Sequence, residues 1–164
     1  MFTASKLTLG LAVVTLFGVN VAAAQNNAQI NVSATVQTPI TVTAANNLDF
    51  GNVFPGVNKT VAVTDAAAGR FNVAGQASAP VSMTFVLPAN LSAGANLLPI
   101  ANWTGNHNTS AAPTGTGFTP SAAATAATLS ATGQLFVYIG AQVSPSVSQA
   151  AGNYTGTVQL TVVY

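Results

Sequence analysis

The sequence predicts an all-β fold, an immunoglobulin-like β-sandwich of about seven to eight mostly antiparallel strands. Val, Thr and Ile recur in short runs that alternate apolar and polar side chains, which is the pattern of half-buried strands. Gly, Pro and Asn interrupt these runs, as they do at turns. Charged helix formers are scarce beyond residue 24, because Glu is absent and Lys59 and Arg70 are the only lysine and arginine there.

The individual strands follow from this alternation. We expect them, in chain order, at Ala28–Gln37, Ile40–Thr43, Leu48–Phe54, Asn58–Thr64, Arg70–Ala74, Val81–Leu87, Gln134–Val143 and Tyr154–Tyr164. The last one alternates most clearly, so one of its faces is buried and the other is wet. Residues Leu135–Ile139 are instead apolar without a break, which predicts a central strand that is covered on both faces.

Two segments lack strand patterning. Pro88–Pro99 is a connection of small residues around Gly94, and Thr104–Thr132 is a long loop rich in Gly, Ala, Thr, Ser and Pro. A poorly paired strand near Ala124–Leu129 is the one regular element expected in this loop. A loop of this length inside a compact domain is often functional or mobile.

The first 24 residues predict an export signal. Lys6 supplies a positive start, Leu7–Val21 is apolar, and Ala22-Ala23-Ala24 precedes a cleavage point before Gln25. A transmembrane anchor is the alternative, but the apolar run of about 15 residues is shorter than the roughly 20 that a spanning helix needs. We therefore divide the chain into a signal peptide (1–24), an N-terminal extension (25–38) and a sandwich (39–164).

Charge is almost absent from the exported part. Its charged side chains are Asp49, Lys59, Asp65 and Arg70, which cancel. Acid–base catalysis, metal binding and phosphate binding need several charged or titratable groups at one place. Nucleic acid needs clustered Lys and Arg. We therefore expect no enzyme, no catalytic residues, no metal, no cofactor, no small-molecule substrate and no nucleic-acid partner.

The few titratable residues support this expectation. His107, the only histidine, lies in a segment of loop composition, where a solvated side chain is the simplest interpretation. Asp49 and Asp65 are the only possible carboxylate pair. Both resemble turn or strand-end residues whose carboxylates bond local backbone amides. Cysteine is absent, so stability must come from core burial and strand pairing, and we expect neighbouring subunits to supplement them.

A carbohydrate site is the main alternative to a purely structural role. Trp103 is the only tryptophan, and Asn106 and His107 follow it closely. An aromatic platform flanked by amides suits a sugar ring, whereas the simpler interpretation is that Trp103 caps one end of the core. The alternative function is a monomeric periplasmic or surface binding module.

The N-terminal extension is the strongest indication of assembly. Ala28–Gln37 alternates apolar and polar residues and has no charge. Its apolar members would share one side of an extended strand; they are Ile30, Val32, Ala34 and Val36. Such a strand can complete its own domain or add to the sheet of a neighbouring copy, where backbone hydrogen bonds give affinity and alternate side chains give specificity. The pattern alone leaves both possibilities open.

Two motifs flank the predicted sandwich. In Leu48-Asp49-Phe50-Gly51 the period of two places both large side chains in the core and the carboxylate outside, and Gly51 permits a bulge or a close approach. Gly152-Asn153-Tyr154 opens the last strand. Tyr154 is expected to bury its ring and to bond a loop carbonyl with its hydroxyl.

These motifs carry a resemblance. The first strand followed by Leu-x-Phe-Gly, and the closing Gly-x-Tyr strand, resemble the exported bacterial proteins of the domain of unknown function 4402 family. The chain is more distantly similar to spore coat protein U and to subunits of chaperone–usher pili. The resemblance implies an immunoglobulin-like sandwich that is exported to the periplasm of a Gram-negative bacterium and then reaches the cell surface or the medium.

The function that the resemblance implies is structural. We expect a non-enzymatic subunit of a pilus or other surface fibre that associates with copies of itself, with a periplasmic chaperone and an outer-membrane usher as partners. In pilin-like families an N-terminal extension completes the neighbour's sandwich, and Ala28–Gln37 occupies the matching position. This chain lacks the disulfide that many such pilins carry.

Overall fold

The computed structural model describes residues 26–164, so the predicted signal peptide lies outside the described residues. The chain divides into two units, the first ending at Thr35 and the second spanning Val36–Tyr164. Every strand of the described residues belongs to the second unit. No helix among residues 26–164 is long and apolar enough to cross a membrane.

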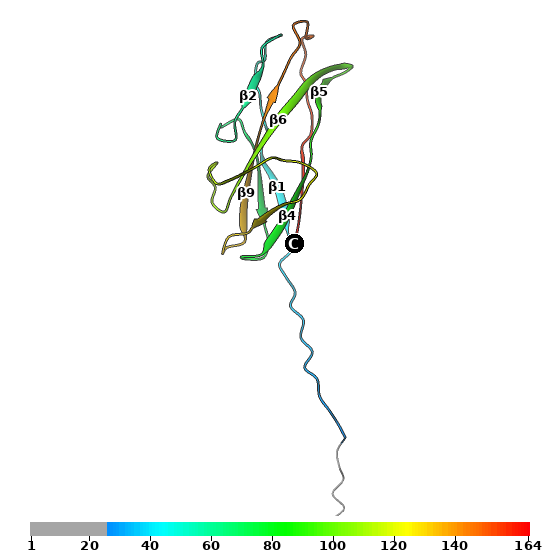
Figure 1. Ribbon diagram of the computed structural model, residues 1–164, viewed down its shortest axis with the longest axis vertical. Helices are drawn as coiled ribbons and strands as arrows, with labels where there is room; N and C mark the ends of the chain where they lie inside the picture. Colours follow the sequence, from blue (N-terminus) through cyan, green and yellow to red (C-terminus); the bar gives the residue numbers. More distant parts are fainter. Residues whose placement is uncertain (1–25) are drawn as a thin grey trace, which may run out of the picture. The chain divides into compact units, whose positions relative to one another are not determined.

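Ten strands occur within residues 26–164. They are β1 (Thr41–Asn46), β2 (Lys59–Val61), β3 (Gly69–Ala74), β4 (Pro80–Val86), β5 (Asn90–Ala93), β6 (Asn96–Asn108), β7 (Thr116–Phe118), β8 (Thr125–Thr128), β9 (Gln134–Val143) and β10 (Gln159–Val163). The larger sheet has the order β1-β3-β9-β6-β5, with β2 also pairing β9 and β7 also pairing β6 (Figure 1). The smaller sheet has the order β10-β4-β8.

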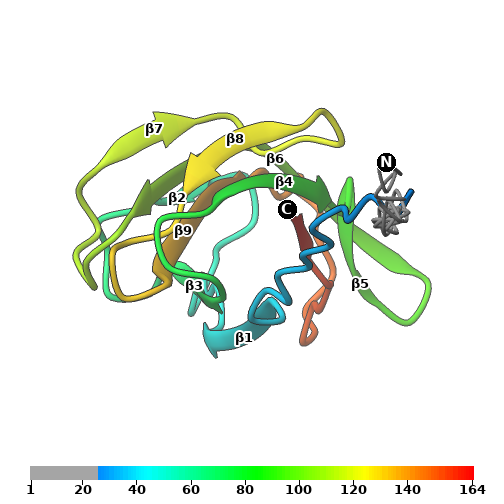
Figure 2. The ribbon, with the colours of Figure 1, turned by 90° about the horizontal axis from the view of Figure 1, so that it is seen from below.

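The two sheets form the predicted β-sandwich. All strand pairs are antiparallel. Viewed along the strands, β4 and β8 lie on one side of the core, and β9 and β3 lie on the other (Figure 2). The all-β, immunoglobulin-like class expected from the sequence is therefore confirmed.

Strand β9 is the centre of the larger sheet, and its bounds are those predicted. Leu135, Val137 and Ile139 point into the sandwich and are at most 1% exposed. Tyr138, which alternates with them and so faces the other way, is also buried. The continuous apolar run predicted a central strand that is covered on both faces, and the structure confirms this.

The core consists of two neighbouring clusters. The first joins β9 to the smaller sheet through Met83, Phe85 and Leu160. The second lies around Phe50, Ile100 and Val143. Trp103 packs against both clusters, in line with the simpler interpretation of this residue as part of the core.

Both segments predicted to lack strands were misjudged. Pro88–Pro99 contains the hairpin of β5 and β6, which turns at Gly94 with φ of +60°. Thr104–Thr132 contains the end of β6 and also β7, neither of which was predicted, whereas β8 confirms the strand expected near Ala124–Leu129. Small residues hid β5 and β7 because they give little apolar contrast, whereas pairing with β6 stabilises both strands.

The prediction of a strand at Leu48–Phe54 is wrong, but the prediction that Leu48 and Phe50 pack in the core is confirmed. The segment is a loop, yet Phe50 is buried and Leu48 packs against the second cluster. The backbone N–H of Asp49 donates to the carbonyl of Ala67, and Gly51 adopts a φ of +57°. Isolated backbone bonds and a left-handed turn at Gly51 replace the ladder that we expected.

The predicted strand Ala28–Gln37 is also wrong for this chain taken alone. Residues 26–40 form no strand in the structure. An extended segment becomes a strand only when a neighbour accepts and donates its backbone hydrogen bonds. The alternation in its sequence therefore shows how it can pair, and not that it is paired.

Candidate functional site

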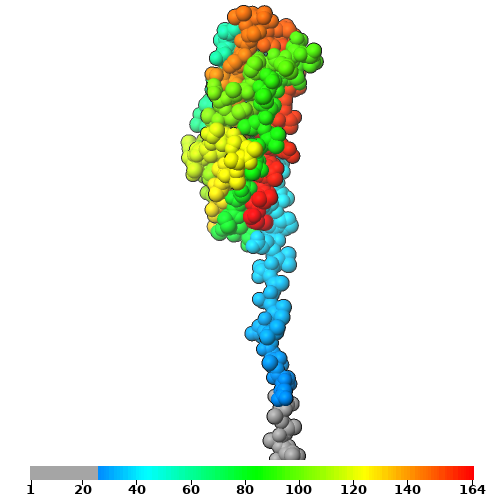
Figure 3. Space-filling view, turned by 45° about the vertical axis from the view of Figure 1, so that its right-hand side comes forward, coloured from blue at the N-terminus to red at the C-terminus, as the bar shows by residue number. Residues whose placement is uncertain are grey.

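Two free strand edges border the same side of the sandwich. β1 pairs only with β3, and β10 pairs only with β4. The two strands come near each other without pairing. In the space-filling view the C-terminal strand, in red, lies beside the cyan residues at the start of the sandwich (Figure 3). Each strand therefore presents unpaired N–H and C=O groups to this side.

The inner face of β1 has no cover. Val42 is 37% exposed although it lies in register with Val73, which is 1% exposed. Ala44 is exposed as well, and its partner Phe71 is only half-buried. Inward-facing apolar residues of a complete sandwich are normally buried by the opposite sheet. The smaller sheet lacks a strand opposite β1.

A groove of about 1160 Å³ opens at this place. Its floor comes from the larger sheet, and it includes Phe71, Leu98, Ile100, Trp103, Ile139 and Val143. Its walls come from the loop 46–55 and from residues 149–158, which lead into β10. Asp49 is the only charged residue among the described residues that line the groove. The groove is thus nearly uncharged, and both apolar side chains and uncharged polar ones line it.

Residues 149–158 hold one wall in place by hydrogen bonds. The Tyr154 hydroxyl donates to the carbonyl of Ala150 at 2.7 Å, as predicted, and accepts from the Gln149 amide at 2.7 Å. Ser92 and Thr155 exchange two backbone hydrogen bonds. These bonds fix this wall to β5.

The predicted subunit-contact residues are all exposed. Ile30 is 86% exposed, Val32 is 87% exposed and Val36 is 95% exposed, and Ala34 is exposed too. Soluble domains rarely leave several large apolar side chains this exposed without a partner. The extension therefore has the alternating apolar residues of a half-buried strand, although these residues are exposed.

A cluster of hydrogen bonds anchors the chain where the extension leaves the sandwich. The C-terminal Tyr164 hydroxyl accepts from the backbone N–H of Gln76 at 2.7 Å and donates to the carbonyl of Thr38. The Gln76 side-chain oxygen accepts from the Thr38 backbone N–H at 3.3 Å. The exit point of the extension is therefore held beside the end of β10.

The three candidate sugar contacts do not converge. Trp103 lines the large groove, whereas His107 lines a separate pocket of about 430 Å³ beside β8. Asn106 is in register with Tyr138, and His107 is in register with the core residue Val137. Adjacent residues of a strand face opposite sides of the sheet, so the side chain of Asn106 points away from those of Trp103 and His107. The structure therefore places these three residues apart from one another.

His107 is not a fully solvated loop residue. It lies in β6, it is half-buried, and its ring centroid is 5.9 Å from that of Phe118. Burial lowers the pKa of His107 below its usual value of 6.5, because desolvation disfavours the charged imidazolium. No group of three or more His, Cys, Asp or Glu residues within 26–164 is placed to hold a metal ion.

Both carboxylates make the local bonds that we expected. Asp49 accepts from the Gly51 N–H at 2.7 Å, and Asp65 accepts from the Ala62 N–H at 2.8 Å. Each therefore stabilises its own turn. Neither of them has a hydrogen bond to His107 in the described part of the chain.

The sequence did not reveal a polar row on the outer face of the larger sheet. Arg70 and Asn106 flank Tyr138 in register, and Asn72 lies two residues further along β3. Within residues 26–164, the buried polar side-chain atoms without a partner are Arg70 Nε, Asn72 Oδ1 and Asn106 Oδ1. Alternation in β3 and β6 is the signal that places them on one face.

The groove itself was also missed. Phe71 and Trp103 resemble ordinary core residues in the sequence, and only the topology leaves them partly uncovered. The family model described as "Domain of unknown function (DUF4402)" matches residues 40–164. No curated protein matches the chain.

Proposed function

Because the chain belongs to the DUF4402 family, which assigns it no activity, we propose a function from its own groove and extension. The protein is a non-enzymatic structural subunit of a bacterial pilus or other surface fibre. Residues Ala28–Gln37 of one copy insert into the groove of an adjacent copy and pair with β10. The observation that carries this proposal is the uncovered inner face of β1 beside the free edge of β10.

The dimensions of the two parts match. Ten extended residues span about 33 Å, at roughly 3.3 Å per residue. The edge of β10 together with the groove wall at 153–158 is about as long. Ile30, Val32, Ala34 and Val36 would face the groove floor, and the polar residues between them would face water.

The free energy of insertion must come from both the extension and the groove. Burying the three larger side chains yields about 1.5–3 kcal/mol each. Ordering ten backbone residues costs about 1–2 kcal/mol each. Side-chain burial in the extension is therefore insufficient by itself. Covering Val42, Phe71 and Trp103, and pairing the backbone edge of β10, supplies the remainder.

The open groove and the exposed extension explain why we expect a chaperone and an usher as partners. A monomer with an open groove and a bare apolar extension would aggregate. We therefore propose export to the periplasm of a Gram-negative bacterium, capping of the groove there by a chaperone, and delivery through an outer-membrane usher to the cell surface.

Deletion of residues 28–37 tests the proposal. We expect a folded monomer with an unchanged far-UV circular dichroism spectrum and no fibres in electron micrographs, because the sandwich residues remain while the inserting strand is gone. Size-exclusion chromatography with light scattering would give the distribution of oligomers. Fibres formed normally by the deletion variant would refute the proposal.

A matched pair of variants separates the two faces of the extension. Ile30→Ser with Val32→Ser should abolish assembly, since both side chains would face the groove. Asn31→Ala with Ser33→Ala alters the opposite face of the same segment and should leave assembly intact. Equal loss in both variants would show that the alternation has no role.

A further inference from the structure

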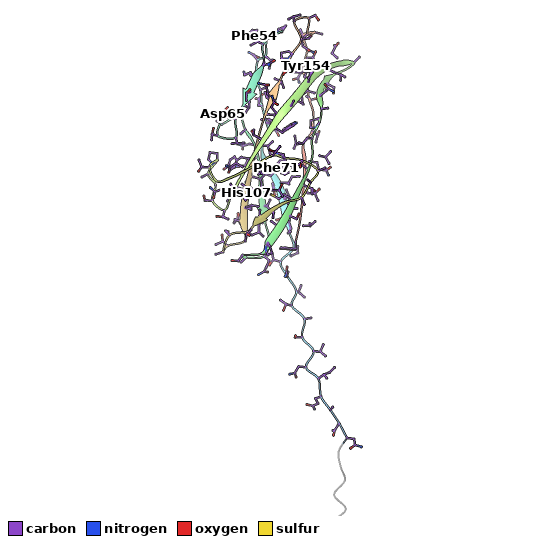
Figure 4. The ribbon with its side chains drawn as sticks, viewed as in Figure 1. Phe54, Asp65, Phe71, His107 and Tyr154 are labelled. Atoms are coloured by element: carbon purple, nitrogen blue, oxygen red, sulfur yellow. The ribbon has the colours of Figure 1, made fainter. Side chains whose placement is uncertain are left out.

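The sandwich has two distinct ends. The base is the end that carries Thr38, Gln76 and Tyr164, where the extension leaves. The tip is the opposite end, where Phe54 lies (Figures 1 and 4). β10 runs toward the base, because the C-terminal Tyr164 follows it there.

Exposed apolar side chains gather at the tip. Phe54 is 69% exposed, Val57 is 57% exposed and Val147 is 87% exposed. The turn that holds the first two contacts the turn of the third, since the Gly56 N–H donates to the Ser146 carbonyl at 3.0 Å. These three residues form the tip surface.

Leu97 extends this surface. It is 56% exposed, and its carbonyl accepts from the Gln149 amide at 3.0 Å, which joins the β5–β6 hairpin to the turn beside Val147. The tip surface is continuous with the groove, because Phe54, Pro55 and Pro145 line the groove as well. An apolar patch at this end has no role in the fold of a single copy.

The direction of the inserted strand decides which ends of two copies meet. Gln37, the last residue of the inserting segment, directly precedes the anchored Thr38, so the two sandwiches must touch. An inserted strand antiparallel to β10 would emerge at the tip of the acceptor. A parallel one would emerge at the base, and two copies could then exchange extensions as a closed pair.

We infer that the tip surface docks the base of the next copy, an inference that rests on the proposed function. The base offers apolar side chains of its own, since Val163 is 53% exposed and Tyr164 is 48% exposed. Antiparallel pairing is also slightly more stable per residue than parallel pairing. The contact joins two different surfaces, so it can repeat from copy to copy, and it produces an open fibre when the rotation between copies does not close a ring.

Thiol cross-linking tests the geometry, because the chain contains no cysteine of its own. Val147→Cys and Val163→Cys are exposed substitutions, one at the tip and one at the base. The two purified variants are mixed, allowed to assemble and treated with a short thiol-to-thiol cross-linker. We expect the mixed tip–base product to dominate, as identified by mass spectrometry of the linked peptides.

The controls separate this inference from the proposed function. Val163→Cys alone should give little product, because bases do not meet; abundant base–base product, or assembly without tip–base product, would overturn the tip contact. If either outcome is observed, assembly of the Ile30→Ser/Val32→Ser variant still tests whether strand insertion occurs. Assembly that persists in that variant would defeat the proposed function instead.

Discussion

At the scale of single residues, this chain uses its few charged and aromatic groups to fix turns. Asp49, Asp65 and Tyr154 each bond backbone or side chains of their own loop. Phe50 gives the loop 46–55 its attachment to the core, since its ring is buried in the second cluster. Short-range patterns revealed these roles because each depends on neighbours in the sequence.

Phe50→Ala should lower the free energy of unfolding by about 3–5 kcal/mol, since it removes a buried ring and leaves a cavity. Urea denaturation followed by tryptophan fluorescence measures this change. Phe54→Ala is the matched control, because Phe54 lies in the same loop and is 69% exposed. Similar losses in both variants would show that Phe50 is not a core residue.

His107 makes stability depend on pH. Its pKa is lowered in the folded state, so the unfolded chain binds more protons as pH falls below about 6.5. Stability should therefore be complete above that pH and decrease below it. His107→Gln should flatten this dependence between pH 7 and pH 5, as thermal melts at several pH values would show. A wild-type melting temperature that is constant over this range would contradict the assignment.

At the scale of elements, turns with positive φ join the strands. Gly94 and Gly133 have φ of +60° and +74°. A Cβ at Gly94 would meet nothing within 4 Å, whereas one at Gly133 would lie 2.2 Å from the Gly75 carbonyl oxygen. Both glycines thus require a positive φ, but only at Gly133 would a side chain also clash with neighbouring atoms.

Gly94→Ala should destabilise the protein by about 1 kcal/mol, which is the conformational cost alone. Gly133→Ala should destabilise it much more, because the turn between β8 and β9 must also move. Thermal unfolding by differential scanning calorimetry compares the two variants directly. An equal effect would mean that the turn at Gly133 relaxes freely.

At the scale of the whole molecule, near-neutrality and an unfinished sandwich act together. The charges beyond residue 24 cancel, so copies do not repel one another. The groove is nearly uncharged and the extension has no charge. Association under this proposal is driven by apolar burial and by backbone pairing, and both are insensitive to screening.

Fibre formation should therefore change little between low and high sodium chloride concentration. Ala34→Asp should stop it, because insertion would bury an unpaired carboxylate. Light scattering during assembly measures both effects. A strong decrease in the rate with added salt would indicate that charge attraction drives association instead.

The sequence by itself determined the all-β class, the central strand β9, the core role of Phe50 and the local bonds of both carboxylates. Alternation and turn chemistry act over a few residues, so they are visible without a structure. The β5–β6 hairpin and β7 were not predicted, because small side chains give weak alternation.

Only the tertiary structure decided that the sandwich is open beside β10. An edge is unpaired because of where strands far apart in sequence come to lie, and no local pattern records that. The same reason separates Trp103, Asn106 and His107, which are close in sequence and lie at three different surfaces. Strand direction and the bulge between Ala101 and Thr104 determine where each side chain points.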